Sequence, residues 1–160
     1  MQEIHPFAPV FDRDSRILIL GSFPSVRSRE EGFYYGHPRN RFWQMLAALT
    51  NSETPRSVEE KRAFLAARHI ALWDVIASCE IEASADSSIR GAKPNDLSPL
   101  LAQTKIEAIF TNGKTADRLY RASFGETAVC LPSTSPANAA WTLPKLIDAW
   151  RVILPPLGLS

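Results

Sequence analysis

The sequence predicts an α/β fold, a three-layer α/β/α sandwich with a central four-stranded parallel sheet. Four short apolar runs have the length and composition of strands buried on both faces. Helical patterns separate these runs, and alternating strands and helices are typical of a parallel sheet covered on both sides. The 160 residues are 45% hydrophobic and 22% charged, which is ordinary for a folded domain. We find no repeat or linker, so residues 1–160 are predicted to form a single domain.

The predicted strands are the runs 17–20, 70–73, 106–110 and 127–131. The predicted helices begin near Asn40, at the capping box 57–60, after Gly113 and at Leu143. The last helix is the clearest, because apolar residues recur at helical spacing up to Leu154 and Pro144 lies in its first turn. Residues 78–95 are polar and rich in serine, and they predict a long functional loop or a partly helical segment.

Composition and charge exclude several classes of protein. A formal net charge of +1 excludes a nucleic-acid binder that relies on bulk positive charge, although it leaves room for a local basic patch. No apolar run approaches the ~20 residues of a membrane span, and residues 1–14 do not have the pattern of a secretory signal. We therefore expect a cytoplasmic protein without membrane contact, in which Cys79 and Cys130 are reduced thiols in the core.

The predicted topology indicates where a ligand would bind. Ligands of parallel sheets bind beyond the carboxyl ends of the strands. Two segments rich in turn residues follow strands at that edge: residues 21–25 after the first strand and residues 132–138 after the fourth. They are expected to face one cleft from opposite sides.

The stretch 32–43 is an unusual aromatic segment, Gly-Phe-Tyr-Tyr-Gly-His-Pro-Arg-Asn-Arg-Phe-Trp. An aromatic loop can stack on a nucleic-acid base, or it can simply cover the core. Asn40 has a similar alternative, since asparagine is a favoured N-cap. Arg39 and Arg41 are either solvated helix charges or phosphate contacts.

Common catalytic machinery is missing from the sequence. The histidines and cysteines do not have the spacing of a metal site, so no metal is predicted. There is no Gly-x-Ser-x-Gly nucleophile elbow, dinucleotide fingerprint or P-loop. The residues alone predict an α/β domain with an aromatic, mildly basic cleft.

Three motifs in order resemble the uracil-DNA glycosylase superfamily. They are Gly-Ser-x-Pro-Ser at 21–25, Tyr-Tyr-x-x-Pro-x-Asn-x-Phe-Trp at 34–43, and Pro-Ser-Thr-Ser-Pro-Ala at 132–137. The stretch 32–43 is also similar to the mismatch-specific uracil glycosylases, but the set is most similar to the hypoxanthine-DNA glycosylase branch, called family six. The resemblance covers essentially the whole chain and implies the same α/β/α fold.

The resemblance also implies roles for individual residues. Gly21, Pro24 and Ser25 correspond to the loop that activates water in most relatives, but Phe23 replaces the usual Asp or Asn, and a phenyl ring cannot orient water. In the hypoxanthine branch this catalytic role is attributed to the residue that matches Asn40.

A base-binding pocket and a DNA-binding loop follow from the same resemblance. Tyr35 matches the ring that stacks on the flipped base, and Ser22, Phe23 and Asp74 are expected to line its pocket. For Asp74 a helix-capping role is the alternative. The expected minor-groove loop consists of Pro132, Ser133, Thr134, Ser135, Pro136 and Asn138. The expected phosphate contacts are Arg27, Arg29, Arg39, Arg41 and Lys114.

The expected activity is that of a monofunctional DNA glycosylase that removes a deaminated base, most specifically hypoxanthine, by direct attack of water and without a cofactor. Leu131 replaces the His or Asn with which efficient uracil enzymes stabilise the departing base. Two alternatives stay open: a uracil- or xanthine-excising enzyme of this fold, and a non-catalytic nucleic-acid-binding module. We expect a monomer that acts on damaged double- or single-stranded DNA.

Overall fold

The computed structural model describes residues 2–4, 7–23, 32–80 and 90–159. Its strands are β1 (Gln2–Ile4), β2 (Ile17–Gly21), β3 (Ile70–Asp74), β4 (Ile76–Glu80), β5 (Arg90–Pro94), β6 (Ala108–Asn112) and β7 (Val129–Leu131). Its helices are α2 (Phe42–Leu49), α3 (Val58–Arg68), α4 (Ser98–Ala102), α5 (Lys114–Phe124) and α6 (Leu143–Trp150), followed by the 3₁₀ turns η2 (Arg151–Ile153) and η3 (Pro155–Leu157).

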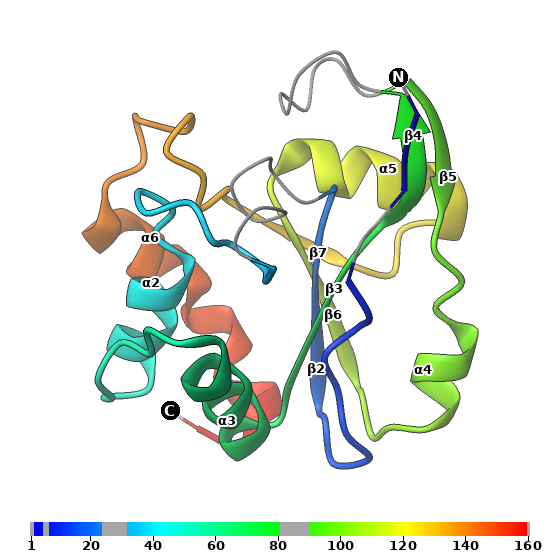
Figure 1. The fold of residues 1–160 in the computed structure, drawn as a ribbon. Coiled ribbons are helices and arrows are strands. Elements are labelled where there is room, and N and C mark those ends of the chain that lie inside the picture. The colour runs from blue at the N-terminus through cyan, green and yellow to red at the C-terminus, as the bar shows by residue number, and fades with distance from the viewer. Residues whose placement is uncertain (1, 5–6, 24–31, 81–89, 160) are drawn as a thin grey trace.

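The central sheet is parallel and has the strand order β3-β2-β6-β7 (Figure 1). This confirms the predicted fold class. Strands β6 and β7 begin two residues later than predicted, at Ala108 and Val129, and β6 extends to Asn112. The extension places Asn112 at the carboxyl edge of the sheet, where it pairs with Leu131.

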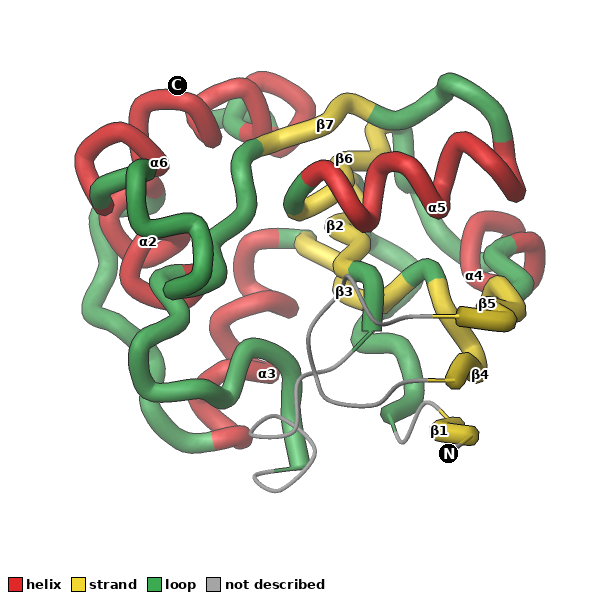
Figure 2. Tube along the Cα trace, turned by 90° about the horizontal axis from the view of Figure 1, so that it is seen from above, coloured by secondary structure: helices red, strands yellow, loops and turns green. Residues whose placement is uncertain are grey.

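Helices cover both faces of the sheet, and each face has its own apolar cluster (Figure 2). Side chains alternate along a strand, so Ile17 and Ile19 of β2 pack with α2, α3 and α6, whereas Leu18 and Leu20 pack with α4 and α5. All four β2 side chains are fully buried. This burial explains why the β2 sequence is a continuous aliphatic run rather than an alternating one.

A second, antiparallel sheet of order β1-β4-β5 lies on the α4–α5 side of the parallel sheet (Figure 2). The prediction of a loop or partly helical segment over residues 78–95 is therefore wrong where the structure describes it. Strand β4 follows β3 after a single residue, and Asn95 fixes this junction by donating from Nδ2 to the carbonyls of Asp74 and Ile76 at 2.8 and 3.2 Å. Strands β4 and β5 pair at the periphery of the fold, and their polar composition differs from that of the buried strands.

Local signals account for the helix boundaries. Ser57 caps α3, since its hydroxyl accepts a hydrogen bond from the Glu60 N–H at 3.0 Å, as the capping box predicts. The predicted last helix ends earlier than expected, at Trp150, and continues as two 3₁₀ turns. Pro155 lacks an amide proton and restricts the residue before it, which disfavours an α-helical continuation.

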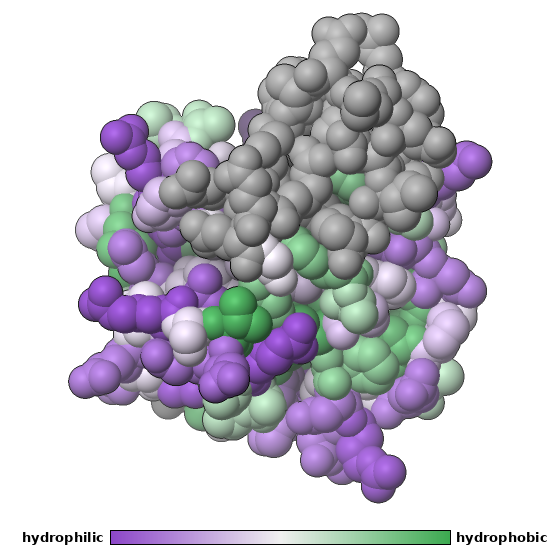
Figure 3. All heavy atoms as spheres, viewed as in Figure 1, coloured by the Kyte–Doolittle hydropathy of each residue, from purple (hydrophilic) through white to green (hydrophobic). Residues whose placement is uncertain are grey.

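Hydrophilic groups occupy much of the periphery on the side seen in Figure 3, with apolar groups between them. The exposed large apolar side chains lie on separate elements: Val58, Leu101, Val129, Trp141, Val152 and Leu159. Such scattered exposure is normal for a protein surface. Within the described ranges, none of the helices has the length and hydropathy of a membrane span.

Candidate active site

Four chain segments meet at the carboxyl edge of the parallel sheet, where the topology predicted a site. Gly21 and Asp74 end β2 and β3 and are register partners. Asn112 and Leu131 end β6 and β7 and are also register partners. The loop 132–138 leaves β7 at this edge, and the residue after β6, Gly113, donates from its amide to the Leu131 carbonyl at 2.8 Å.

Gly21, Asp74 and Tyr35 are packed closely together. A Cβ atom on Gly21 would lie 2.4 Å from Asp74 Oδ1 and 3.1 Å from the Tyr35 hydroxyl. Only glycine fits here without displacing these groups. Asp74 is 3% exposed and is followed by β4 rather than by a helix, so the alternative of a helix-capping aspartate is wrong.

Tyr35 is the member of the aromatic segment whose hydroxyl lies beside Gly21. Its ring stacks on Phe42 with centroids 4.0 Å apart and an angle of 22° between the ring planes. Phe42 is fully buried and Tyr35 partly buried. Tyr35 also has a φ of 54°, a conformation rare outside glycine that costs about 1–3 kcal/mol and tends to occur at functional positions.

The neighbouring rings cover the core, as the alternative interpretation of this segment held. Phe33 and Tyr34 are each 2% exposed. Tyr34 donates from its hydroxyl to the Ala8 carbonyl at 3.1 Å. Burial, reinforced by the nearby Asp74 carboxylate, raises the pKa of Tyr34 far above its usual value, so this hydroxyl stays protonated.

Asn40 joins the start of α2 to the loop 132–138. Its Oδ1 accepts hydrogen bonds from the Phe42 amide at 3.0 Å and from the Thr134 hydroxyl at 2.8 Å. The N-cap residue of α2 is Arg41, which makes no side-chain capping bond. Asn40 therefore supports the first turn of the helix from one residue earlier than an N-cap, and only its oxygen is used for this purpose.

Thr134 is the centre of this connection. It is fully buried, its amide donates to Asn112 Oδ1, and its hydroxyl accepts from Asn112 Nδ2, each at 3.1 Å. Asn112 was missed in the sequence. The available signal was a polar residue two positions after a predicted buried strand, at the edge where ligands bind.

Arg41 holds the loop 132–138 and the residues after it. Its amide and Nε donate to the Thr134 carbonyl, its Nη2 donates to the carbonyls of Ser135 and Asn138 at 2.7 and 3.2 Å, and its Nη1 donates to that of Trp141. Its nitrogens are thus directed at the protein, in contrast to the predicted phosphate contact. Arg39 and Lys114 are exposed, and phosphate contacts by them stay predictions.

The expected DNA-binding loop is ordered by its own contacts as well. Asn138 donates to the Ser133 carbonyl at 3.0 Å, and Trp150 of α6 donates from its indole to the Pro132 carbonyl at 2.9 Å. Together with Lys114 and Trp141, the loop lines an open depression of about 540 Å³. Pro136 lies at its partly exposed turn.

The other predicted site residues are placed as follows. Ser22 and Phe23 are 8% and 9% exposed, and Phe23 packs in the cluster on the α4–α5 side. Leu131 is buried in the cluster on the opposite face. Pro24 and Ser25, and with them Arg27 and Arg29, lie outside the described residues.

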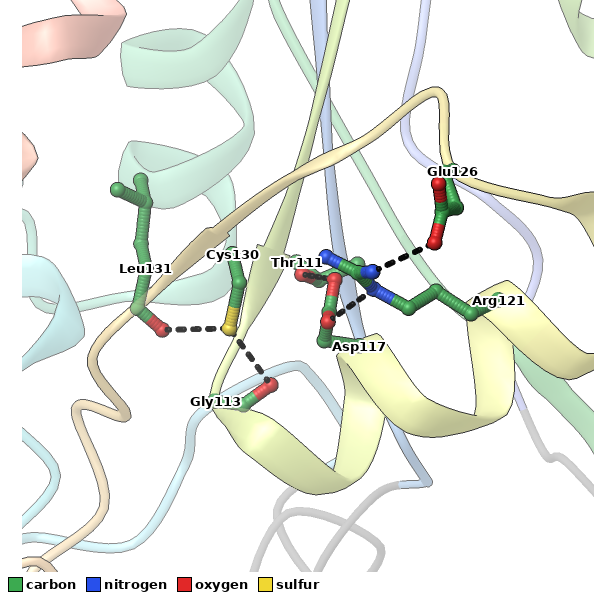
Figure 4. Close-up of polar contacts among 7 residues, drawn as sticks. All are labelled: Thr111, Gly113, Asp117, Arg121, Glu126, Cys130 and Leu131. Carbon is green, nitrogen blue, oxygen red and sulfur yellow. Dashed lines mark hydrogen bonds and ion pairs between the residues drawn. The ribbon is translucent and has the colours of Figure 1, made fainter.

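A polar cluster supports the edge of the sheet behind the loop (Figure 4). Asp117 accepts from the Thr111 hydroxyl at 3.0 Å and from Arg121 Nε at 2.7 Å, and Arg121 also pairs with Glu126 at 3.1 Å. Cys130 is a free thiol, but it is exposed on the outer strand β7, so its predicted core position is wrong. Desolvation, and secondly the negative charge of Asp117, raise the pKa of this thiol. The side chain of Cys79 is outside the described part.

Comparison with known proteins agrees with this architecture. The model of the uracil DNA glycosylase superfamily matches residues 8–154. The chain belongs to the uracil DNA glycosylase superfamily. A hypoxanthine DNA glycosylase of Methanosarcina acetivorans is 39% identical over 137 residues, which are 82% of this chain and 86% of the relative. A hypoxanthine DNA glycosylase of Methanosarcina barkeri is 33% identical over the same shares of both chains.

A solved structure shows the same superfamily fold. It is a solution NMR structure from Methanosarcina acetivorans, described as a candidate uracil DNA glycosylase. The match has a TM-score of 0.78 and 32% sequence identity, and it covers 96% of this chain and 99% of the other. In the part of this superfamily member that the structure describes, no three His, Cys, Asp or Glu side chains are grouped as a metal ion would require.

Proposed function

We propose that the protein is a monofunctional DNA glycosylase that removes hypoxanthine from deoxyinosine in DNA. The activity of its relatives, hypoxanthine DNA glycosylases at 33% and 39% identity, supports this proposal. The single observation that carries it is the position of Asn40, whose amide is held at the carboxyl edge of the sheet by Thr134. Asn40 supplies a polar amide to a site in which the Phe23 ring offers no hydrogen-bonding group.

The reaction cleaves the bond between C1′ of the sugar and N9 of the base. The bonding electrons leave with the base, and the sugar passes through a state like an oxocarbenium ion, as in the hydrolysis of other glycosides. The oxygen of a water molecule then bonds to C1′ and loses a proton, and the departing base takes up a proton. The products are free hypoxanthine and an abasic site.

Binding of the base precedes this step and uses Tyr35 and Asp74. The base must leave the stack, which costs a few kcal/mol, and stacking on the Tyr35 ring returns about 1–3 kcal/mol. The stack of that ring on Phe42, with centroids 4.0 Å apart, fixes the plane in which it meets the base. A carboxylate oxygen accepts hydrogen bonds, so Asp74 suits the N1–H of hypoxanthine and not the unprotonated N1 of adenine.

The leaving group also fits a sparsely equipped site. Negative charge on hypoxanthine is delocalised over its O6–N1 amide, so this base departs more readily than adenine. Efficient uracil excision is not proposed, because Leu131 stands where strong uracil enzymes have His or Asn, and it is buried. We further propose that the protein acts as a monomer in the cytoplasm, on single- or double-stranded DNA.

Single-turnover excision on matched duplexes tests the proposal. The duplexes contain one deoxyinosine, deoxyuridine, deoxyxanthosine or deoxyadenosine each, and abasic sites are revealed with alkali in the presence of EDTA. We expect fastest cleavage at deoxyinosine, with no dependence on metal. Fastest cleavage at uracil or xanthine would replace the proposed substrate, and binding without excision would favour a non-catalytic module. Asp74→Asn is expected to narrow the preference for inosine over adenosine.

A further inference from the structure

We propose that Thr134 and Asn112 are positioning residues that hold the Asn40 amide with its nitrogen toward the reaction, so that Asn40 acts as a hydrogen-bond donor. This inference rests on the proposed glycosylase function and makes it more specific. It assigns a direction to every hydrogen bond in the chain Asn112–Thr134–Asn40. It also opposes the view that Asn40 accepts a proton or a hydrogen bond from the attacking water.

Two backbone amides fix the direction of this chain, because an N–H group only donates. The Thr134 amide lies 3.1 Å from one side-chain atom of Asn112, so that atom is the oxygen, and the other, which contacts the Thr134 hydroxyl, is Nδ2. In the same way, the Phe42 amide identifies the Asn40 atom at 3.0 Å as Oδ1. Exchanging Oδ1 and Nδ2 in either side-chain amide would place two donors against each other.

The Thr134 hydroxyl has one proton, and the acceptor that remains for it in this series of hydrogen bonds is Asn40 Oδ1. Because the hydroxyl oxygen accepts from Asn112 Nδ2, its own proton is directed to Asn40 Oδ1 at 2.8 Å. The whole arrangement is rigid, since Thr134 is fully buried and Asn112 is 9% exposed. Arg41 adds two hydrogen bonds to the Thr134 carbonyl.

The consequence concerns what Asn40 offers to a substrate. A carbonyl oxygen has two lone pairs, and Phe42 and Thr134 occupy both of those on Oδ1. Asn40 Nδ2 has no acceptor within hydrogen-bonding distance among the described residues, and Asn40 is only partly buried. Its two N–H groups are therefore the part of the amide that can act on the substrate.

A donor assists the group that gains electrons. In this reaction that group is the departing purine, which receives the electron pair of the C1′–N9 bond. A preorganised donor is most effective where negative charge develops. A donor directed at the water would instead engage the lone pairs that water needs for attack. We therefore assign Asn40 to the leaving base.

Asn40→Asp tests the direction of the amide, because the carboxylate keeps both acceptor bonds of Oδ1 and changes only the outward atom from donor to acceptor. We expect single-turnover excision of hypoxanthine to fall about 10²–10³-fold at neutral pH, with duplex affinity and melting temperature close to those of the wild type. The rate should rise as the pH is lowered toward 5, since protonation returns a donor to the free oxygen. Asn51→Asp adds the same charge at an exposed position beyond the far end of α2 and serves as the control.

An Asn40→Asp variant that keeps half or more of the wild-type rate, or that loses its rate on acidification, would overturn the donor role. Both results are expected of a group that accepts from water. The pH profile separates the two roles of Asn40. If Asn40 is a donor, the rate of Asn40→Asp rises as the pH is lowered, and if it accepts from water, that rate falls. A purely structural role of Asn40 predicts neither slope.

Thr134→Val and Thr134→Ser test the positioning role. Valine keeps the shape but removes the hydroxyl, and we expect the rate to fall about 10–100-fold without a matching loss of duplex affinity. Serine keeps the hydroxyl and should recover most of the rate. Asn112→Asp should behave like valine, because its new oxygen would take the Thr134 proton away from Asn40. Thr127→Val removes a different threonine hydroxyl, which contacts Tyr120 at 2.5 Å, and is the matched control.

A measurement without turnover separates this inference from the proposed function. In ¹⁵N spectra the side-chain NH₂ signals of Asn40, identified by their loss in Asn40→Asp, should shift in Thr134→Val and stay in place in Thr127→Val. If these signals do not move in Thr134→Val, the positioning role is wrong even for an active enzyme. If the wild type excises no hypoxanthine while the signals shift as expected, the proposed function fails and the positioning role stands.

Discussion

Asp74 Oδ1 occupies the space in which a side chain on Gly21 would lie, 2.4 Å from the ideal Cβ position. The two residues are register partners at the ends of β2 and β3. The absence of a side chain at position 21 thus lets a buried carboxylate lie over the end of β2, beside Tyr35.

Gly21→Ala is expected to destabilise the fold by about 1–3 kcal/mol, as overpacking in a tight site does, and to lower excision of hypoxanthine. Urea unfolding measures the first effect. In Asp74→Ala the clashing atom is gone, so the added methyl should cost much less in the double variant. Equal costs with and without the carboxylate would show that another group resists the methyl.

Tyr35→Ala should weaken binding to lesion-containing duplex by about 1–3 kcal/mol, the usual contribution of a base–aromatic stack. Tyr35→Phe keeps the ring on Phe42 and should bind and turn over like the wild type. Fluorescence anisotropy and single-turnover rates measure both variants. An inactive phenylalanine variant would give the hydroxyl a chemical role and contradict stacking as the main contribution.

Arg41→Lys is expected to loosen the loop 132–141, because one ammonium group cannot replace a guanidinium that reaches several carbonyls at once. Hydrogen exchange over this segment should accelerate, and excision should fall. Arg118→Lys, on the exposed side of α5, is the control. If Arg41→Lys leaves both exchange and excision unchanged, the hydrogen bonds from the Arg41 guanidinium are not needed to order this segment.

Arg39→Ala and Lys114→Ala report on phosphate contacts. Each lost contact should reduce the magnitude of the log–log salt slope of duplex binding by about 0.9, equally for lesion and undamaged DNA. For about 3–5 phosphates the wild-type slope would be about −3 to −4.5. Unchanged slopes would place the DNA on another surface.

Alkylation of Cys130 should show the raised pKa of its thiol. The thiolate is the reactive form, so in a Cys79→Ser background the rate with iodoacetamide should reach its midpoint above the ~8.5 of a free cysteine. Partial desolvation of the thiol by its neighbours is the main cause, with the negative charge of Asp117 second. Asp117→Asn should move the midpoint down, and a midpoint that moves up would contradict the assigned effect of that carboxylate.

The sequence predicted the parallel sheet and its helices because those elements are buried and periodic. The run from Ile17 to Leu20 contains no polar residue, and Ser57 marks the start of α3 by its own hydrogen bond. Strands β4 and β5 escaped prediction because they pair at the periphery, where side-chain pattern is weakly constrained.

The structure places several of the residues predicted for the site near one another, but their contacts were not foreseen. Asn40 and the loop 132–138 lie at one edge of the sheet, in agreement with the order of the motifs. The motif that contains Asn40 also led to the prediction that Arg41 contacts phosphates. Its hydrogen bonds to carbonyls depend on how the loop folds back over α2, and carbonyl positions have no signature in side-chain sequence. For the same reason the pairing of Asn112 with Thr134, 22 residues apart, was not foreseen.

The bonds from Asn40 and Arg41 to the loop 132–141 bear on how such an enzyme can be redesigned. The loop predicted to bind DNA and the amide assigned to catalysis share Thr134, so they do not behave as interchangeable modules. A loop taken from a relative would be separated from the residues that hold it in its own protein, the counterparts of Asn40, Arg41 and Asn112 here. New lesion preferences are therefore better sought around Tyr35 and Asp74, which the loop's hydrogen bonds do not include.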